Sequence, residues 1–320
     1  MSRAGICASI VETICDTPLV ELSRVKGSRD GRILMKLEYL LPGGSKKDRA
    51  AREIIEEAMR NGQLTPGQTV VELTSGNMGT GLAIVCKAFG HPFVAVMSKG
   101  NSTERRVMMA ALGAEIILVD QAPGGVPGKV SGADLELVKQ VTDRIVHERQ
   151  AFHASQLNLP GNFNSHYAHT GQEILRQTAG EFDAFVDFVG SGGSFGGCAK
   201  AFKEFKSAIQ CYIAEPSGSP VLAGKPTINP AHKIQGGGYQ WTDLIALEGA
   251  RIDGYVQVSD DEAIDAARRL ARDEGIFAGY SSGANLAAAF QLLEGACRGK
   301  TIVILADDSG LKYLSTNLWK

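Results

Sequence analysis

The stretch AFVDFVGSGGS at residues 184–194 starts as an apolar strand and ends in a turn made only of glycine and serine. A helical pattern follows at residues 195–205, so the turn lies between a strand and a helix. At such a turn the backbone N–H groups and the positive end of the helix dipole can bind an anion. The turn carries no charged residue, and a phosphate would be held by the amides and hydroxyl groups of Gly190, Ser191, Gly192, Gly193 and Ser194.

A second turn of this kind occurs at residues 74–79, where TSGNMG follows the apolar run VVEL. One glycine-rich turn alone is often explained by tight packing. Two of them in one chain favour a binding function.

Around these turns, strand-like and helix-like segments alternate along the chain, which predicts an α/β fold with a mostly parallel sheet. Ser259 and Ser281 precede helical patterns, and we expect both to cap helices. The predicted strands are residues 70–73, 93–97, 115–120, 184–190, 209–215, 254–259 and 301–306, and the predicted helices are residues 48–60, 79–89, 103–112, 135–149, 163–177, 195–205, 260–274 and 282–293.

The composition excludes several classes of protein. The 320 residues are 44% apolar and 21% charged, with a net charge of −2, which fits neither a disordered chain nor a basic nucleic-acid-binding protein. The apolar runs are far shorter than the roughly 18 residues of a membrane helix. The six cysteines form no CxxC pair, and His166 and His169 lack further ligands nearby, so we expect no metal site. The N-terminus does not follow a leader pattern, which predicts a cytoplasmic protein.

The segment PGGSKKDR at residues 42–49 opens a predicted helix with two lysines. A lysine there faces the positive end of the helix dipole, which disfavours its ammonium form. A neutral amine can form a Schiff base or act as a general base. Two solvated surface lysines are the alternative interpretation of this segment.

Together these segments resemble the cysteine synthase and cystathionine β-synthase family of pyridoxal-phosphate (PLP) enzymes. The resemblance rests on Ser45 to Arg49, on the two turns, and on further segments in the same order. These are STERR at 102–106, Gln156 and Asn158, HKIQG at 232–236, SSG at 281–283 and YLST at 313–316.

The resemblance implies a role for each matching residue. Lys47 would bind PLP covalently and remove the substrate's Cα proton. Lys46 would occupy a variable position, and its replacement by alanine would barely change turnover. Ser281 would face the pyridine nitrogen, which favours loss of a β-substituent over transamination. The other PLP-binding residues would be Asn77, Gly190, Ser191, Gly192, Gly193 and Ser194, and the substrate-binding residues would be Thr74, Ser75, Gly76, Met78, Gln156 and Gly236.

The resemblance also implies PLP fold type II, similar to the tryptophan synthase β subunit, with two open twisted sheets. Residues 1–44 would supply strands packed on the larger domain, residues 45–150 a smaller mobile domain, and residues 151–320 the larger domain. The implied reaction is β-replacement on O-acetylserine, O-phosphoserine or serine by sulfide or a thiol, in a protein that is commonly a homodimer.

Other functions remain open at this point. Met78 stands where the family usually has threonine, and Tyr239 after HKIQ is more like the cystathionine β-synthase branch. A cystathionine β-synthase-like or β-eliminating enzyme and a non-catalytic relative are therefore alternatives. A nicotinamide-dependent oxidoreductase is a remote alternative. Its G-x-G-x-x-G motif, started at Gly190, would need glycine at position 195, where this chain has Phe195.

Overall fold

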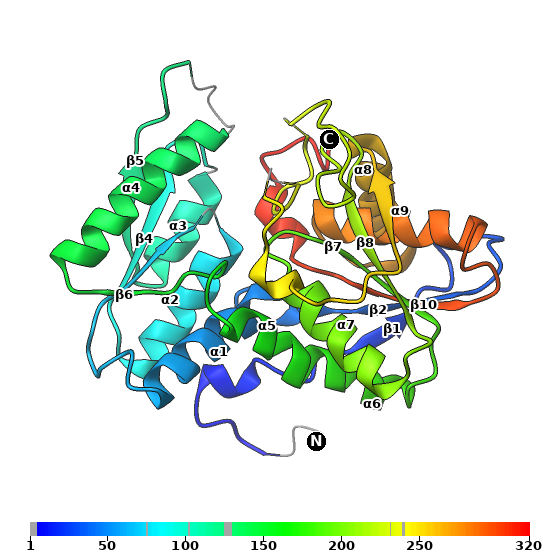
Figure 1. The fold of residues 1–320 in the computed structure, drawn as a ribbon, viewed down its shortest axis with the longest axis horizontal. Helices are drawn as coiled ribbons and strands as arrows, with labels where there is room; N and C mark the ends of the chain where they lie inside the picture. The colour runs from blue at the N-terminus through cyan, green and yellow to red at the C-terminus, as the bar shows by residue number, and fades with distance from the viewer. Residues whose placement is uncertain (1–4, 75, 102, 125–129, 231, 239–240) are drawn as a thin grey trace. The chain divides into compact units, whose positions relative to one another are not determined.

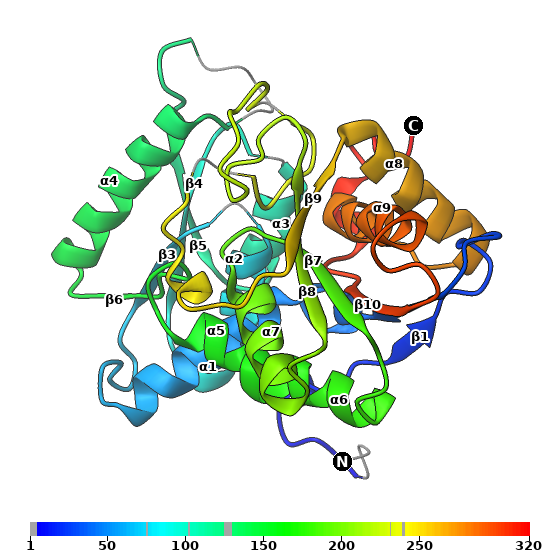
Figure 2. The same cartoon turned by 45° about the vertical axis from the view of Figure 1, so that its right-hand side comes forward.

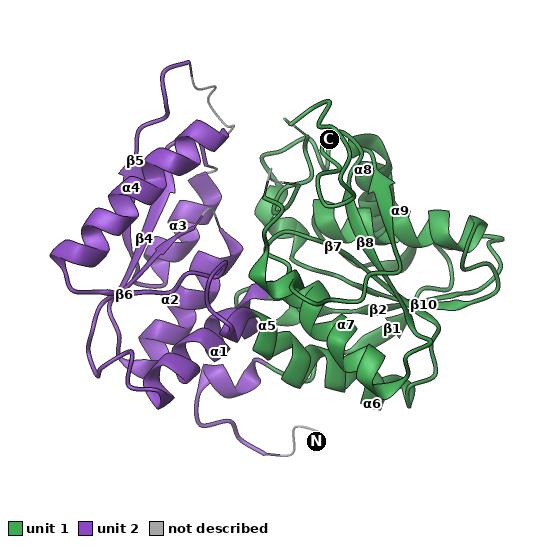
Figure 3. Cartoon of the chain, in the orientation of Figure 1, with its two compact units in different colours: residues 1–2, 15–46, 163–320 green, residues 3–14, 47–162 purple. Residues whose placement is uncertain are grey.

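The computed structural model describes residues 5–74, 76–101, 103–124, 130–230, 232–238 and 241–320 (Figure 1). Contacts divide the chain into two compact units, which are coloured separately in Figure 3. Unit 1 comprises Cys15–Lys46 and Phe163–Lys320, and unit 2 comprises Lys47–Asn162 with the preceding stretch that ends at Ile14. The two consecutive lysines of the KKDR segment therefore belong to different units.

Unit 1 is built on a six-stranded sheet in the order β1-β2-β10-β7-β8-β9. The β1 strand runs antiparallel to β2, and the other neighbouring strands are parallel. The strands are β1 (Leu19–Glu21), β2 (Arg32–Lys36), β7 (Ala184–Phe188), β8 (Gln210–Pro216), β9 (Gly254–Val258) and β10 (Thr301–Leu305).

Helices cover both faces of this sheet, because its central strands are apolar on both sides. Figure 2 shows α8 and α9 along one face and α7 along the other. Phe185 of β7 contacts Phe195 and Phe202 of α7, whereas its neighbours Ala184 and Val186 join the core with α8 and α9. The helical segments are α6 (Gln172–Thr178), α7 (Gly193–Phe205), α8 (Asp260–Arg269), α9 (Tyr280–Glu294), the π-helical η3 (His166–Gly171) and η5 (Leu270–Glu274), and the short 3-10 turns η2 (Glu38–Leu40), η4 (Ile245–Leu247) and η6 (Gly310–Tyr313).

Unit 2 has a four-stranded parallel sheet in the order β5-β4-β3-β6. Its helix α1 packs so closely on α2 that a Cβ at Gly81 would lie 3.0 Å from the Cβ of Ala51. The elements are β3 (Val70–Leu73), β4 (Phe93–Ser98), β5 (Glu115–Val119), β6 (Phe152–His153), α1 (Lys47–Arg60), α2 (Asn77–Phe89), α3 (Thr103–Ala111), α4 (Gly132–Glu148) and η1 (Ile10–Thr13); α5 (Gly161–Ser165) crosses the boundary to unit 1.

The structure confirms the predicted α/β class with two mostly parallel sheets and corrects several details. Ser259 caps α8, as predicted, in a reciprocal pair with Glu262. Ser281 does not cap α9, because that helix starts at Tyr280, after Gly279, two residues earlier than predicted. The predicted helix at 163–177 contains a π-helical segment, and β6 was not predicted. None of the helices in the described part of the chain has the length and apolar character required to cross a membrane.

Candidate active site

The glycine turn of unit 1 connects β7 to the N-terminus of α7. Gly192 precedes that helix with a φ of 81°, a left-handed conformation that favours glycine. As glycine, this N-cap residue has no side chain to bond the first-turn amides of the 13-residue helix. A helix start of this kind can bind an anion, and the phosphate contacts of residues 190–194 stay a prediction.

Gly236, which was predicted to contact substrate, lies against this turn. A Cβ at Gly190 would be 1.9 Å from the carbonyl oxygen of Gly236, so only glycine fits at position 190. A Cβ at Gly237 would likewise be 2.2 Å from the carbonyl oxygen of Val189. The structure thus brings two predicted site segments together within unit 1, while Tyr239 lies outside the described residues.

In unit 2, Thr74 organises the second turn. Its Oγ1 accepts a hydrogen bond from the backbone amide of Gly79 at 2.8 Å and a longer one from Gly76 at 3.4 Å. A hydroxyl that accepts two hydrogen bonds still has one proton to donate. Asn77 is partly exposed at the start of α2, Met78 is 2% exposed, and Ser75 lies outside the described residues.

Lys47 and Gln156 are the other predicted site residues of unit 2. Lys47 is the first residue of α1 and is partly buried. The backbone amide of Gln156 lies 3.4 Å from Oε1 of Glu72, whose Oε2 is 3.2 Å from Nε2 of His153. Burial raises the pKa of Glu72, and its hydrogen bond raises the pKa of His153. Glu72, which the sequence analysis missed, thus holds Gln156 in place.

Lys46 lies in a buried charged cluster of unit 1 and is 8% exposed. Its Nζ is 2.9 and 3.1 Å from the carboxylate oxygens of Asp187 and 2.8 Å from Oδ1 of Asp307. Asn285 of α9 completes this group, which we call the Lys46 cluster, because its amide donates to both aspartates at 3.3 to 3.4 Å. The expectation that replacing Lys46 barely changes turnover stays a prediction, but its ammonium neutralises buried carboxylates and so has a structural task.

The Lys46 cluster lies against two segments that carry predicted PLP-binding residues. Ser194 donates its hydroxyl hydrogen to Oδ2 of Asp187, so its amide rather than its hydroxyl is available to an anion. Ser281, which is 8% exposed, precedes Ser282, whose hydroxyl accepts a hydrogen bond from the backbone amide of Asp307 at 2.9 Å. The cluster therefore connects the glycine turn to the start of α9.

Electrostatics explain why Lys46 stays charged. Burial by itself would lower its pKa, but the charges of Asp187 and Asp307 outweigh that effect and raise it. Burial raises the pKa of Asp307 to about 7, with Lys46 opposing the shift and Asp187 adding to it. The Asp307 carboxyl thus keeps its proton to a higher pH than an exposed carboxyl does.

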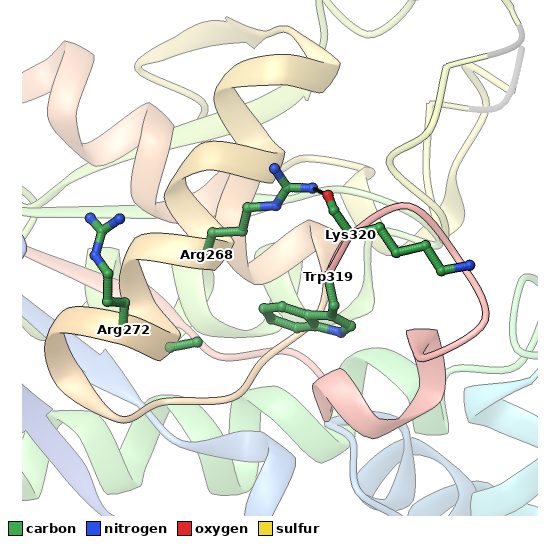
Figure 4. A pocket seen from close by; sticks show the side chains of 5 residues that line it. Arg268, Arg272, Trp319 and Lys320 are labelled. Atoms are coloured by element: carbon green, nitrogen blue, oxygen red, sulfur yellow. Dashed lines mark hydrogen bonds between the residues drawn. The ribbon is translucent and has the colours of Figure 1, made fainter.

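Other conspicuous polar groups are not part of the predicted site. A shallow hollow near the C-terminus is lined by Arg268, Arg272, Trp319 and Lys320 (Figure 4). Arg268 already donates to backbone carbonyls there, and the hollow contains none of the predicted site residues. His166 is buried, and its Nδ1 forms a hydrogen bond with the Thr170 hydroxyl. Among the described residues, no group of His, Cys, Asp and Glu could hold a metal ion.

Comparison with known proteins identifies the class of enzyme to which this fold and these turns belong. Residues 10–308 match the family described as pyridoxal-phosphate dependent enzyme, and the chain belongs to that family. It is 39% identical over 312 residues to a cysteine synthase of Staphylococcus aureus, an alignment that covers 97% of this chain and 96% of the relative.

Two solved structures have the same fold over nearly the whole chain. O-Acetyl serine sulfhydrylase isoform 3 from Entamoeba histolytica has a TM-score of 0.90 at 35% identity, covering 100% of this chain and 93% of that one. O-Ureido-L-serine synthase has a TM-score of 0.89 at 34% identity, covering 98% and 96%. The predicted family, fold type II and the cofactor PLP are thereby confirmed.

Unit 1 provides features that fit PLP. The glycine turn offers uncapped helix amides to the phosphate, and the absence of a Cβ at Gly190 leaves its backbone accessible at close range. Ser281, in the first turn of α9, carries a neutral hydroxyl, which is the group that the resemblance implies at the ring nitrogen.

Proposed function

We propose that this chain catalyses PLP-dependent β-replacement on a serine-type amino acid, with sulfide or a thiol as the nucleophile, as a cysteine synthase does. The observation that carries the proposal is the uncapped helix N-terminus at the glycine turn, in a chain that matches a PLP family over residues 10–308. The names of its relatives, cysteine synthase and O-acetyl serine sulfhydrylase, support O-acetylserine as the first substrate to test.

Each predicted residue has a defined task in this proposal. PLP, when bound, stabilises the negative charge that develops at the substrate's Cα. Lys47 carries the cofactor, and its Nζ takes up the Cα proton. The phosphate is held by the amides of Gly190, Ser191, Gly192, Gly193 and Ser194, the ring by Asn77 and Ser281, and the substrate by Thr74, Ser75, Gly76, Met78, Gln156 and Gly236.

Neutral donors suit the substrate carboxylate in this proposal. Thr74 accepts a hydrogen bond from the Gly79 amide and has its hydroxyl proton to donate. Gln156 is fixed through its backbone by Glu72 and by Asn162, whose amide donates to its carbonyl at 2.8 Å. Its side-chain amide is thus held on a fixed backbone and can donate to the carboxylate.

The alternatives are less well supported. The comparisons do not favour a cystathionine β-synthase-like or β-eliminating activity over cysteine synthesis. A nicotinamide-dependent oxidoreductase would leave the Lys47 segment without a role. We further propose a cytoplasmic homodimer and the three-part division at residues 44 and 150, with a smaller mobile domain, as in the family.

The test is a direct assay of cysteine formation. Purified protein loaded with PLP is supplied with sulfide and, in parallel, with O-acetylserine, O-phosphoserine or serine. We expect cysteine from at least one of the three and none from Lys47→Ala. Full PLP binding without cysteine or another β-replacement product would refute the proposal, as would a fully active Lys47→Ala variant.

A further inference from the structure

The Lys46 cluster is the strongest feature that the proposed reaction leaves unused, and it is bonded to both sides of the glycine turn. Asp187, near the end of β7, is fully buried and accepts a hydrogen bond from the hydroxyl of Ser194 in the first turn of α7. Asn285 accepts from the backbone amide of Phe188 at 2.6 Å and donates to Asp187 at 3.4 Å. The cluster is therefore hydrogen-bonded to the strand that enters the turn and to the helix that leaves it.

A carboxylate at this place opposes phosphate binding unless its charge is compensated. The turn at residues 190–194 contains no charged residue, so a phosphate there depends on amides and hydroxyl groups alone. Like charges inside a protein repel each other over several ångströms, because water screens them poorly there. An uncompensated Asp187, which is directly bonded to Ser194, would therefore raise the free energy of a bound phosphate.

Lys46 supplies the compensating positive charge. Its Nζ lies 2.9 and 3.1 Å from the two carboxylate oxygens of Asp187 and 2.8 Å from Oδ1 of Asp307. Its backbone amide donates to the backbone carbonyl of Asp307 at 2.8 Å, and the neighbouring Ser45 forms a β-bridge with Asp308. The main chain thus fixes the place at which the ammonium meets the carboxylates.

We propose that Lys46 is a positioning residue of the cofactor's phosphate site, whose ammonium neutralises Asp187 and so allows a turn without cationic residues to bind a phosphate. This inference rests on the proposed function, because it takes residues 190–194 to bind the phosphate of PLP. Lys46 acts through Asp187 and Ser194 and does not itself touch the phosphate. The inference concerns the affinity for the phosphate group and is separate from the expectation about turnover.

The inference is tested with two ligands that differ only in the phosphate, pyridoxine 5′-phosphate and pyridoxine. Both lack the aldehyde of PLP and form no Schiff base, and equilibrium dialysis measures their affinities for the full chain freed of PLP. Lys46→Met should lower the affinity for pyridoxine 5′-phosphate by about tenfold or more and that for pyridoxine much less, because the uncompensated charge repels the phosphate. The matched control Lys36→Met removes the buried ammonium paired with Glu173 and should leave the ratio of the two affinities unchanged.

Two further variants separate charge from packing. Lys46→Met combined with Asp187→Asn and Asp307→Asn leaves no charge in the cluster and should regain the wild-type ratio, although the lysine is absent. Asp187→Asn alone keeps the pair of Lys46 with Asp307 and an amide oxygen that can accept from Ser194. Its ratio should equal or exceed that of the wild type, and this variant keeps the test decisive if Lys46→Met folds poorly.

The outcomes separate this inference from the proposed function. An unchanged ratio in Lys46→Met would overturn this inference alone. A reduced ratio in Asp187→Asn, or one in the triple variant as low as in Lys46→Met, would also overturn it, because the loss would then come from packing. A wild type that binds pyridoxine 5′-phosphate no more tightly than pyridoxine would overturn both this inference and the proposed phosphate site. A reduced ratio in Lys46→Met that the triple variant restores would support it.

Discussion

Replacing Lys46 by methionine tests the Lys46 cluster most sharply. The substitution keeps an unbranched chain of similar length but removes the charge that neutralises Asp187 and Asp307. Removing one partner of a buried ion pair typically costs about 3 to 5 kcal/mol, because the remaining charge is left uncompensated. Lys46 is 8% exposed and Asp187 is fully buried, so we expect a loss in the folding free energy of unit 1 within that range at about pH 8.

The loss should depend on pH in a defined direction. The folded-state pKa of Asp307 is raised to about 7, above its ordinary value of about 3.9. Between these pH values the folded state binds more protons than the unfolded state, so the contribution of Asp307 to stability falls as pH rises. The cost of Lys46→Met should therefore be smaller at about pH 5, where Asp307 keeps its proton.

The assay is urea unfolding followed by tryptophan fluorescence. The two tryptophans, Trp241 and Trp319, both belong to unit 1, as the cluster does. Lys200→Met, which removes an exposed pair with Glu204, is the matched control and should barely change the transition.

Two results bear on the reasoning directly. Adding Asp187→Asn and Asp307→Asn to Lys46→Met should recover more than half of the loss, because no charge is then left unpaired. A loss of less than about 1 kcal/mol in Lys46→Met at both pH values would refute the argument, since that is the range of a solvated surface pair.

Three further variants address the candidate site. Lys47→Ala should lose borohydride-stable PLP attachment and activity while circular dichroism stays unchanged; activity equal to wild type would exclude Lys47 from catalysis. Gly190→Ala places a Cβ 1.9 Å from the Gly236 oxygen and should weaken PLP binding, measured by equilibrium dialysis, at least tenfold. The control Gly132→Ala has open space around the new Cβ and should leave PLP binding unchanged. Equal PLP affinities of Gly190→Ala and wild type would show that the turn does not hold PLP. Met78→Thr should raise kcat/KM for O-acetylserine relative to O-phosphoserine and serine, by up to about tenfold if the new hydroxyl forms a hydrogen bond with the substrate. Unchanged ratios of kcat/KM between these substrates would mean that Met78 only packs in the core.

The segments that could be predicted from sequence are those whose structure is set locally. The strands Val70–Leu73 and Thr301–Leu305 are apolar runs between turn residues, and the structure has them within one residue of the predicted ends. The glycine turn was predictable because its residues meet the conformational demands of a strand-to-helix connection by themselves. The order of the strands in the two sheets was not, since it depends on contacts between distant segments.

The Lys46 cluster could not be predicted from any local pattern. Lys46 and Asp187 are 141 positions apart in the sequence, and Asp307 lies still farther along the chain. A signal was nevertheless present, because an aspartate in the apolar strand AFVDF must find a partner when buried. The start of α9 was misplaced because Ser281 has the residue type of a cap, whereas the helix already begins at Tyr280, after Gly279.

The central claim, that this chain is a PLP enzyme whose cofactor is carried by Lys47, is tested most directly by borohydride reduction of the PLP-loaded protein. Fragment-ion mass spectrometry of the peptide that contains Lys46 and Lys47 then locates the pyridoxyl group. The account predicts one group per chain on Lys47 and an unmodified Lys46. A pyridoxyl group on Lys46 or elsewhere, or none on a protein that shows a PLP spectrum before reduction, would contradict it.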